Sequence, residues 1–157
     1  MFAIRPYRPE DRQQVERHFA EMLNYERVLD KHTVPGEPVA APYMDWLLVE
    51  CARKQGMIYV ADKAGEVIGF VSVYVEHEPD ITTAFNEYLY ICDFVVSAAH
   101  RGQGIGSALL AQAEAYAREV GQKKLQLHVL TNNDNALSVY RRFGLKPYVM
   151  TMLKELD

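Results

Sequence analysis

Three glycines at alternate positions constrain the fold of this chain more than any other feature of its sequence. Gly102, Gly104 and Gly106 lie in VSAAHRGQGIGSALLAQAEAYAREVG, residues 96–121, between an apolar run and a long alanine-rich segment. Because glycine has no Cβ atom, the main-chain amides of such a turn can approach a ligand closely. The segment that follows predicts a helix, whose N-terminus carries about half a positive charge. The sequence therefore predicts an anion site where a strand meets a helix, and pyrophosphate suits that site.

Three phosphate-binding patterns compete for this stretch, and their spacing separates them. A P-loop requires a Gly-Lys pair, which the chain does not contain. A dinucleotide fingerprint requires GxGxxG, but its last position falls on Ser107 or Leu109 here. The third pattern is Arg or Gln, followed by Gly three positions later and by Gly or Ala five positions later. The stretch RGQGIG, residues 101–106, satisfies this third pattern.

The composition is that of an ordinary folded domain. The chain has 157 residues, of which 49% are hydrophobic and 24% are charged, so residues 1–157 are expected to form a single domain. A formal net charge of −4 argues against nucleic acid as a partner, because phosphate neutralisation requires clustered Lys and Arg. No apolar run approaches the roughly 20 residues that cross a bilayer, and no signal peptide is recognisable, so a cytoplasmic location without membrane contact is expected. Cys51 and Cys92 match no metal-binding or disulfide spacing, so neither a metal site nor a disulfide is expected.

Strand and helix patterns alternate along the chain. Period-two patterns rich in β-branched residues predict strands, and apolar spacings of three and four residues predict helices. The predicted strands cover residues 2–7, 57–62, 66–77, 87–97, 123–130 and 146–156. The predicted helices cover residues 11–27, 43–56, 105–120 and 132–144, and residues 30–43 are predicted to form an irregular loop rich in Pro and Gly. This alternation defines an α/β protein, and its sheet is mixed because two successive strands form a hairpin.

The helical spacing also predicts which side chains face the core. The predicted inward positions are Val15, His18, Phe19, Met22 and Leu23 in the first helix, Trp46, Leu47, Val49 and Ala52 in the second, and Ile105, Leu109, Leu110, Ala113 and Tyr116 in the third. Each set forms one apolar stripe along its helix, as expected for a helix that packs on a sheet.

A second motif lies downstream of the glycines. In NDNALSVYRRFGL, the residues Asn133, Ala136, Tyr140 and Gly144 recur at a fixed spacing in a short predicted helix and its exit. Together with RGQGIG, this pattern resembles the two signatures of the GNAT superfamily of acetyl-CoA-dependent N-acetyltransferases. The resemblance covers essentially the whole chain, and the stretch YICDFVVSAAHRGQGIGS is most similar to the diamine and polyamine acetyltransferases. It implies a single-domain fold with a mixed, mostly antiparallel sheet flanked by helices, in which adjacent strands splay apart to form a cofactor cleft.

The resemblance further implies that acetyl-CoA is the co-substrate, and it identifies residues that would bind it. These are Phe94, Val95, Val96, Arg101, Gly102, Gln103, Gly104, Ile105, Gly106, Ser107, Asn133, Ala136, Tyr140 and Arg142. Residues 101–107 would hold the pyrophosphate, and main-chain groups of residues 94–96 would hold the pantetheine amides and the developing oxyanion. The Asn133 side chain would bond the pantetheine arm, and Arg142 would touch the 3′-phosphate.

Acetyl transfer to an amine also requires an acid and a base. An alkylamine has a pKa near 10, so its neutral form costs about 4 kcal/mol at pH 7. By resemblance, the Tyr140 hydroxyl protonates the leaving thiolate. Cys92 and Asp93 are the other catalytic candidates, although look-alikes carry a glutamate at the place of Cys92, and a cysteine is a poor base that can equally be a buried apolar residue. Strand alternation directs Cys92 and Asp93 to opposite faces unless a bulge intervenes.

Several alternatives stay open at the level of sequence. Glu76, Glu78, Asp80 and Glu87 can deprotonate the amine through water or attract a cation, and Tyr140 can be a core tyrosine. A small amine, such as a polyamine, an amino acid or an aminoglycoside-like compound, is favoured over a protein N-terminus or lysine, because the loop at 30–43 and the acidic turn indicate a closed, negative pocket. A non-catalytic acyl-CoA sensor is the alternative from another class. A homodimer is compatible with the resemblance, but no stretch of the sequence defines its interface.

Overall fold

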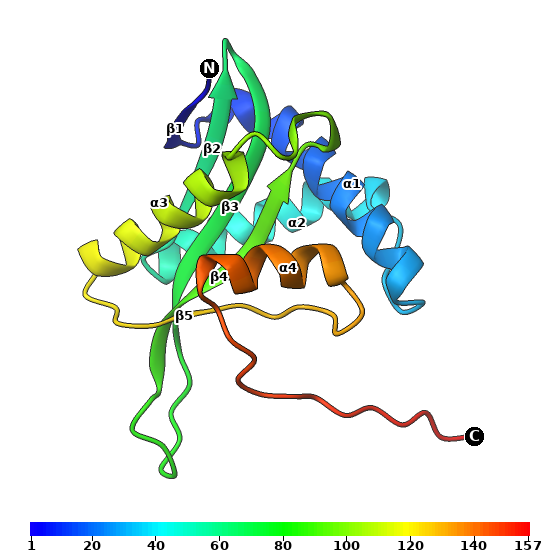
Figure 1. Ribbon diagram of the computed structural model, residues 1–157, viewed down its shortest axis with the longest axis vertical. Helices are drawn as coiled ribbons and strands as arrows, with labels where there is room; N and C mark the ends of the chain where they lie inside the picture. The colour runs from blue at the N-terminus through cyan, green and yellow to red at the C-terminus, as the bar shows by residue number, and fades with distance from the viewer.

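Five strands form one sheet in the computed structural model, which describes all 157 residues (Figure 1). The strands are β1 (Ala3–Pro6), β2 (Met57–Lys63), β3 (Glu66–His77), β4 (Glu87–Val96) and β5 (Leu125–Gln126), and they lie side by side in this order. The helices are α1 (Arg12–Leu29), α2 (Glu37–Arg53), α3 (Ile105–Glu119) and α4 (Asp134–Phe143), with 3₁₀ turns at Pro9–Asp11 and Ala98–His100. Neighbouring strands are antiparallel except β4 and β5, which are parallel, so the predicted mixed and mostly antiparallel sheet is confirmed.

The helices cover both faces of the sheet and bury two apolar clusters. On one face α1 and α2 cover Val60, Phe70 and Val95 of the strands. On the other face α3 covers Val73 and Leu89, and side chains of α4 pack at the edge of the same cluster. Figure 1 shows α3 and α4 in front of the sheet and α2 behind it. None of the helices combines the length and the apolar character that a bilayer crossing requires.

The core positions predicted for α1 and α3 are confirmed. Those buried or packed against a cluster are Val15, His18, Phe19, Met22, Leu23, Ile105, Leu109, Leu110, Ala113 and Tyr116. His18 is the one polar member, and its Nε2 lies 2.6 Å from the carbonyl oxygen of Val67. This hydrogen bond satisfies the imidazole inside an otherwise apolar layer.

The helix α2 begins earlier than predicted, which corrects much of the loop expected over residues 30–43. Pro38 stands in its first turn, where a missing N–H leaves no hydrogen bond unmade. The amide of Gly36, just before the helix, donates to Asn24 Oδ1 on α1 at 3.0 Å. A Cβ atom on Gly36 would overlap the backbone of Ala20. The two helices therefore meet at the point where the sequence indicates an irregular loop.

The predicted inward face of α2 is wrong in part. Trp46, Val49 and Ala52 are exposed, and only Leu47 of that set is buried. The residues that face the sheet are Ala40, Met44, Leu47 and Glu50. Because the helix starts at residue 37, its stripe begins at Ala40 and continues at three- and four-residue steps, and the Glu50 carboxylate at its end is bound by Lys54 at 2.9 Å.

The last two predicted strands also differ from expectation. Only Leu125 and Gln126 of residues 123–130 form a strand, and residues 146–156 form none. A strand requires a neighbouring edge with free main-chain groups, and the two residues of β5 offer almost no ladder to join. The closing segment runs extended beyond α4 in Figure 1. Its exposed apolar side chains, between 70% and 83% accessible, are Tyr148, Val149, Met150, Met152, Leu153 and Leu156.

Candidate active site

Strands β4 and β5 separate after only two residue pairs, the second between Tyr90 and Gln126. β4 continues beyond Tyr90 to Val96, and its edge on this side has no neighbouring strand there. In Figure 1 the chain after β5 runs below α4, whereas β4 rises behind that helix. The predicted splay of two adjacent strands is therefore present, and it leaves main-chain groups of β4 free to pair with a ligand.

Phe94 and Val96 turn their main-chain groups toward this open edge. The amide of Ser97 donates to the carbonyl oxygen of Ile68 on β3 at 2.9 Å, which fixes the direction of this end of β4. Because successive residues of a strand alternate in direction, the amides and carbonyls of Phe94 and Val96 point away from β3. Val95 stands between them and pairs with β3. Of the three strand residues expected at the cleft, two thus present main-chain groups to it.

The turn between β4 and α3 presents a row of unpaired amides. None of the amides from Gly102 to Ser107 donates to an acceptor in the protein. Gly102 and Gly104 have φ values of 77° and 82°, in the left-handed region that favours glycine. A Cβ atom at either glycine would meet no other atom within 4 Å, so the space in front of the turn is open. Together with the N-terminus of α3, these amides form a donor surface that fits a diphosphate.

Polar side chains border the turn and the cleft. Arg101 is exposed, and its Nε donates to the carbonyl oxygen of Val96 at 3.2 Å, so the side chain closes the end of the open β4 edge. Asn133 is buried at the start of α4, where its Oδ1 accepts from the amide of Ala136 at 3.2 Å. This bond caps the helix and leaves the Nδ2 of Asn133 without an acceptor in the protein. Arg142 is exposed at the far end of α4.

Tyr140 lies on α4 beside the open edge. Its ring and that of Phe94 are 5.7 Å apart between centroids, at an angle of 53°. The Phe94 ring also reaches α3, where a Cβ atom on Gly106 would come within 3.1 Å of it. Burial raises the pKa of Tyr140, so its phenol keeps its proton at neutral pH. A protonated hydroxyl group therefore stands next to the main-chain donors of β4.

A β-bulge brings Cys92 and Asp93 to the same face of the sheet. Ser72 of β3 pairs with Asp93, but the next residue, Val73, pairs with Ile91, so Cys92 has no partner. This is the bulge that the two side chains require if they are to share one face. The hydroxyl group of Tyr43 on α2 lies 3.2 Å from Cys92 Sγ and 2.9 Å from Asp93 Oδ1.

The Asp93 carboxylate is buried and fully engaged by neighbouring hydroxyl groups. Ser72 Oγ donates to Asp93 Oδ2 at 2.5 Å and accepts from the Asp93 amide at 3.0 Å. Tyr43 donates to the same carboxyl group. Burial raises the pKa of Asp93 above its ordinary value, although the bonds from Ser72 and Tyr43 oppose this. Asp93 is therefore a structural anchor of the bulge, and only 4% of its surface is exposed.

The Cys92 thiol is not suited to accept a proton. Burial and the neighbouring Asp93 carboxylate raise its pKa to about 12, despite hydrogen bonds from Tyr43 and Tyr74. At neutral pH the group is almost entirely the protonated thiol, which is neither a base nor a strong nucleophile.

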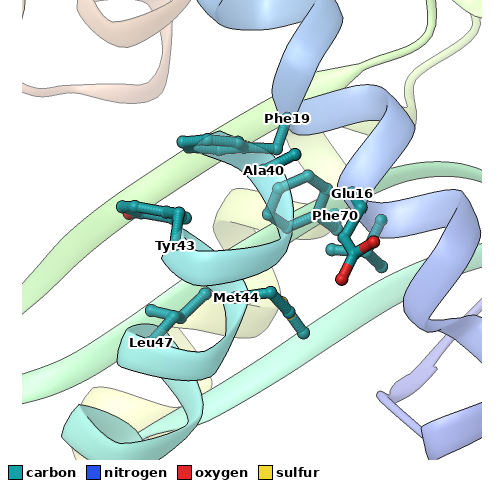
Figure 2. A pocket seen from close by; sticks show the side chains of 8 residues that line it. Glu16, Phe19, Ala40, Tyr43, Met44, Leu47 and Phe70 are labelled. Atoms are coloured by element: carbon teal, nitrogen blue, oxygen red, sulfur yellow. The ribbon is translucent and has the colours of Figure 1, made fainter. Parts of the chain in front are cut away.

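Packing between α1 and α2 holds Tyr43 in place. Figure 2 looks into the apolar pocket between these helices, where the Tyr43 ring lies beneath that of Phe19. The two rings are stacked with centroids 3.9 Å apart and an angle of 10°. The packing leaves no room for a water molecule in this pocket. The hydroxyl group that binds Asp93 is thus fixed by two helices at once.

Two residues of this site, Tyr43 and Glu26, were not predicted from the sequence. Burial, together with Asp93 and Asp30, raises the pKa of the half-buried Glu26 at the end of α1, and the Glu26 charge in turn acts on Tyr140. Glu26 falls four residues after Met22, on the apolar stripe of α1, and a carboxylate on such a stripe is a signal of function. Tyr43 has no comparable signal in the sequence, because an aromatic residue in a helix is usually a core residue.

The chain belongs to the acetyltransferase (GNAT) family, which matches residues 16–145. The fold, the splayed strands and the glycine turn described above are those that the two sequence motifs indicate. The polyamine subgroup within that family is not singled out by the comparisons.

Three relatives illustrate the range of similarity. Streptothricin acetyltransferase of Streptomyces lavendulae is 39% identical over 80 residues, which are 51% of this chain and 39% of that protein. Thialysine N-epsilon-acetyltransferase of Bos taurus is 26% identical over 147 residues, which are 90% of this chain and 82% of that protein. The crystal structure of a GCN5-related N-acetyltransferase from Ralstonia eutropha JMP134 has a TM-score of 0.78 at 26% identity, with 99% of both chains covered. The matches to several curated relatives span only 39% to 55% of their length.

The raised pKa of Asp93 predicts a pH-dependent stability. The folded protein binds this proton more tightly than the unfolded chain, so the stabilisation is present at acid pH and is lost as the pH rises through the folded pKa. The variant Asp93→Asn keeps a neutral side chain of the same shape. We expect the free energy of unfolding of the wild type, relative to Asp93→Asn, to fall in urea titrations as the pH rises above about 4, the ordinary pKa of an aspartate side chain. An exposed control, Asp157→Asn, should show no such trend, and a constant or rising difference for Asp93→Asn would contradict the prediction.

Proposed function

We propose that this protein transfers an acetyl group from acetyl-CoA directly to a primary amine of a small molecule. The observation that carries the proposal is the row of unpaired amides from Gly102 to Ser107 beside the open edge of β4. These donors suit the diphosphate and the amide-containing arm of coenzyme A. Arg142, which is exposed on α4, would bind the 3′-phosphate of coenzyme A. The relatives named for streptothricin and thialysine support a small acceptor.

The acceptor ammonium must lose a proton before its nitrogen attacks the thioester carbonyl carbon. Asp93 and Cys92 are unsuited to take that proton, because the first is buried and bound by Tyr43 and Ser72, and the second is a protonated thiol. Glu26 is half-buried, acts electrostatically on both Asp93 and Tyr140, and has a raised pKa that makes it a better base. The proposal therefore assigns proton acceptance, through water, to Glu26 and a positioning role to Asp93.

Collapse of the tetrahedral adduct breaks the carbon–sulfur bond and releases the thiolate of coenzyme A. The amide of Phe94 or Val96 stabilises the oxyanion that precedes this step, because both face the open edge. The Tyr140 hydroxyl gives its proton to the departing sulfur and recovers one from the solvent or from Glu26. The products are an N-acetylated amine and free coenzyme A, and no acyl-enzyme forms.

The proposal treats residues 1–157 as one acetyltransferase domain in the reducing cytoplasm, where Cys51 and Cys92 remain free thiols. A homodimer would cover the exposed apolar side chains of residues 148–156.

The first test concerns acetyl-CoA binding. In Gly104→Ala the left-handed φ of 82° costs about 1–2 kcal/mol, and the turn relaxes by moving its amides. We expect isothermal titration calorimetry to show acetyl-CoA binding by the wild type and a roughly tenfold larger Kd for this variant. Gly65→Ala, in the β2–β3 turn with a φ of 90°, is the matched control and should bind normally. Absence of binding by the wild type would overturn the proposed function.

The second test concerns the acid. Tyr140→Phe removes the hydroxyl group and keeps the ring against Phe94, so acetyl-CoA affinity should be unchanged. We expect kcat to fall by about 10²–10⁴-fold, as for the loss of a positioned proton donor, in an assay of thiol release with a panel of primary amines. Tyr148→Phe, at an exposed tyrosine, should retain full turnover. Equal turnover of both variants would remove Tyr140 from the mechanism.

The third test concerns the base. Because the pKa of Glu26 lies above its ordinary value, the wild-type kcat/KM should rise with pH as this carboxyl group loses its proton. In Glu26→Gln that acidic limb should disappear and kcat should fall by about 100-fold or more. Glu21→Gln, on an exposed side of the same helix, should keep both the limb and the rate. If the acidic limb of the kcat/KM profile persists in Glu26→Gln, the base is a group other than Glu26.

A further inference from the structure

The end of α1, residues 24–29, carries Glu26 beyond the apolar core. Earlier residues of the helix, among them Val15, Phe19 and Ala20, are buried in the cluster that α1 shares with α2. No apolar side chain of residues 24–29 belongs to either cluster or packs against one. Figure 1 shows this end of α1 projecting away from the strands. Polar contacts therefore determine where Glu26 lies.

Two asparagines around the start of α4 bind this end of α1. Asn132 Nδ2 donates to the carbonyl oxygen of Leu29 at 3.0 Å, and Asn135 Nδ2 donates to the Tyr25 hydroxyl group at 3.3 Å. In Figure 1 the right-hand end of α4 lies next to the last turns of α1. The earlier part of α1 packs on the opposite face of the sheet from α4. The two bonds therefore pass from one face to the other beside the open edge of β4.

These bonds join the two helices that carry the base and the acid of the proposed mechanism. Glu26 follows Tyr25 directly on α1, and Tyr140 lies five residues after Asn135 on α4. The Glu26 charge acts on the Tyr140 phenol, so the two groups are close enough to interact. A change in the position of the end of α1 relative to α4 would therefore separate the base from the acid.

The other polar contacts at this end of α1 do not reach α4. Asn24 donates to Glu37 of α2 at 2.7 Å. Just after the helix, Lys31 and His32 bind Glu155 of the closing segment at 2.8 Å and 2.9 Å. Among the hydrogen bonds and ion pairs of the protein, only the two asparagine bonds hold α1 to the start of α4.

The position of this pair matters because proton transfer acts over a short range. A base must stand within about 3 Å of the proton donor, or one water molecule away, and a misplacement of about 1 Å can lower a rate about 100-fold. The side chains of Tyr25, Asn132 and Asn135 are exposed, so their bonds contribute little to the stability of the fold. Their effect is expected on the geometry of the reaction.

We infer that Tyr25, Asn132 and Asn135 are positioning residues, which bind α1 to the start of α4 across the open edge of β4 and hold Glu26 opposite Tyr140. The inference rests on the proposed function and adds to it three residues that act through the base and the acid.

The test measures kcat and the Kd of acetyl-CoA for the double variant Asn132→Ala/Asn135→Ala, with the amine of the panel that the wild type acetylates fastest. We expect kcat to fall about tenfold or more, because the base is no longer held, and the Kd from calorimetry to stay within about twofold. Ser138→Ala is an exposed truncation on the same helix and should change neither value. The midpoint of urea unfolding should stay close to that of the wild type.

Two further comparisons separate positioning from a general structural effect. In a Glu26→Gln background, proton acceptance no longer depends on residue 26, so the double variant should lower kcat by less than about twofold more. Tyr25→Phe and Asn135→Ala break the same hydrogen bond, so their effects on kcat should not add when the two changes are combined.

A wild-type kcat for the asparagine double variant would overturn the inference. An undiminished effect in the Glu26→Gln background, or a Kd for acetyl-CoA that rises in step with the loss of kcat, overturns it as well, because the asparagines then act on a group other than the base. A wild-type protein that binds no acetyl-CoA refutes the proposed function instead, so the two failures are distinguishable.

Discussion

β4 has one residue more than the stretch of β3 opposite it, and this extra residue, Cys92, reverses the direction of every group that follows. Before it, the odd-numbered residues of β4 face α3. After it, Asp93 faces α1 and α2, and the main chain of Phe94 and Val96 faces the open edge. With a regular register the Asp93 carboxylate would enter the apolar layer under α3, and these main-chain groups would be consumed by β3. β4 thus pairs with both neighbouring strands up to Tyr90, and beyond the bulge it presents free main-chain groups on one side.

The bulge remains in place because polar groups around it are satisfied in full. A buried carboxylate without donors costs several kcal/mol, and Asp93 has donors from Ser72 on the sheet and from Tyr43 on α2. Tyr43 is in turn stacked on Phe19 of α1. The hydrogen bond from Tyr43 to Asp93 therefore links α1 and α2 to β4, the strand with the open edge. Apolar packing alone would not select this strand register.

Local signals in the sequence predicted the parts of the site that local structure determines. The glycine turn between a strand and a helix and the apolar stripe of α3 both follow from residue types at short spacing. The early start of α2 depends on Gly36 meeting Ala20 sixteen residues away, which no local pattern reveals. The shared face of Cys92 and Asp93 depends on the partner strand, and the missing closing strand depends on how short β5 is. Contacts between distant segments account for each difference.

Because Gly36 packs directly against the backbone of Ala20, the connection between α1 and α2 is held against α1. If the proposed acceptor binds beside these helices, a wall that is already packed loses little conformational entropy, so affinity can be gained without ordering a lid. Recognition of the acceptor then depends on the side chains that these two helices carry. Replacing individual residues on these helices is accordingly a direct route to new acceptor preferences, whereas lengthening the connection between the helices would dismantle the support of Tyr43.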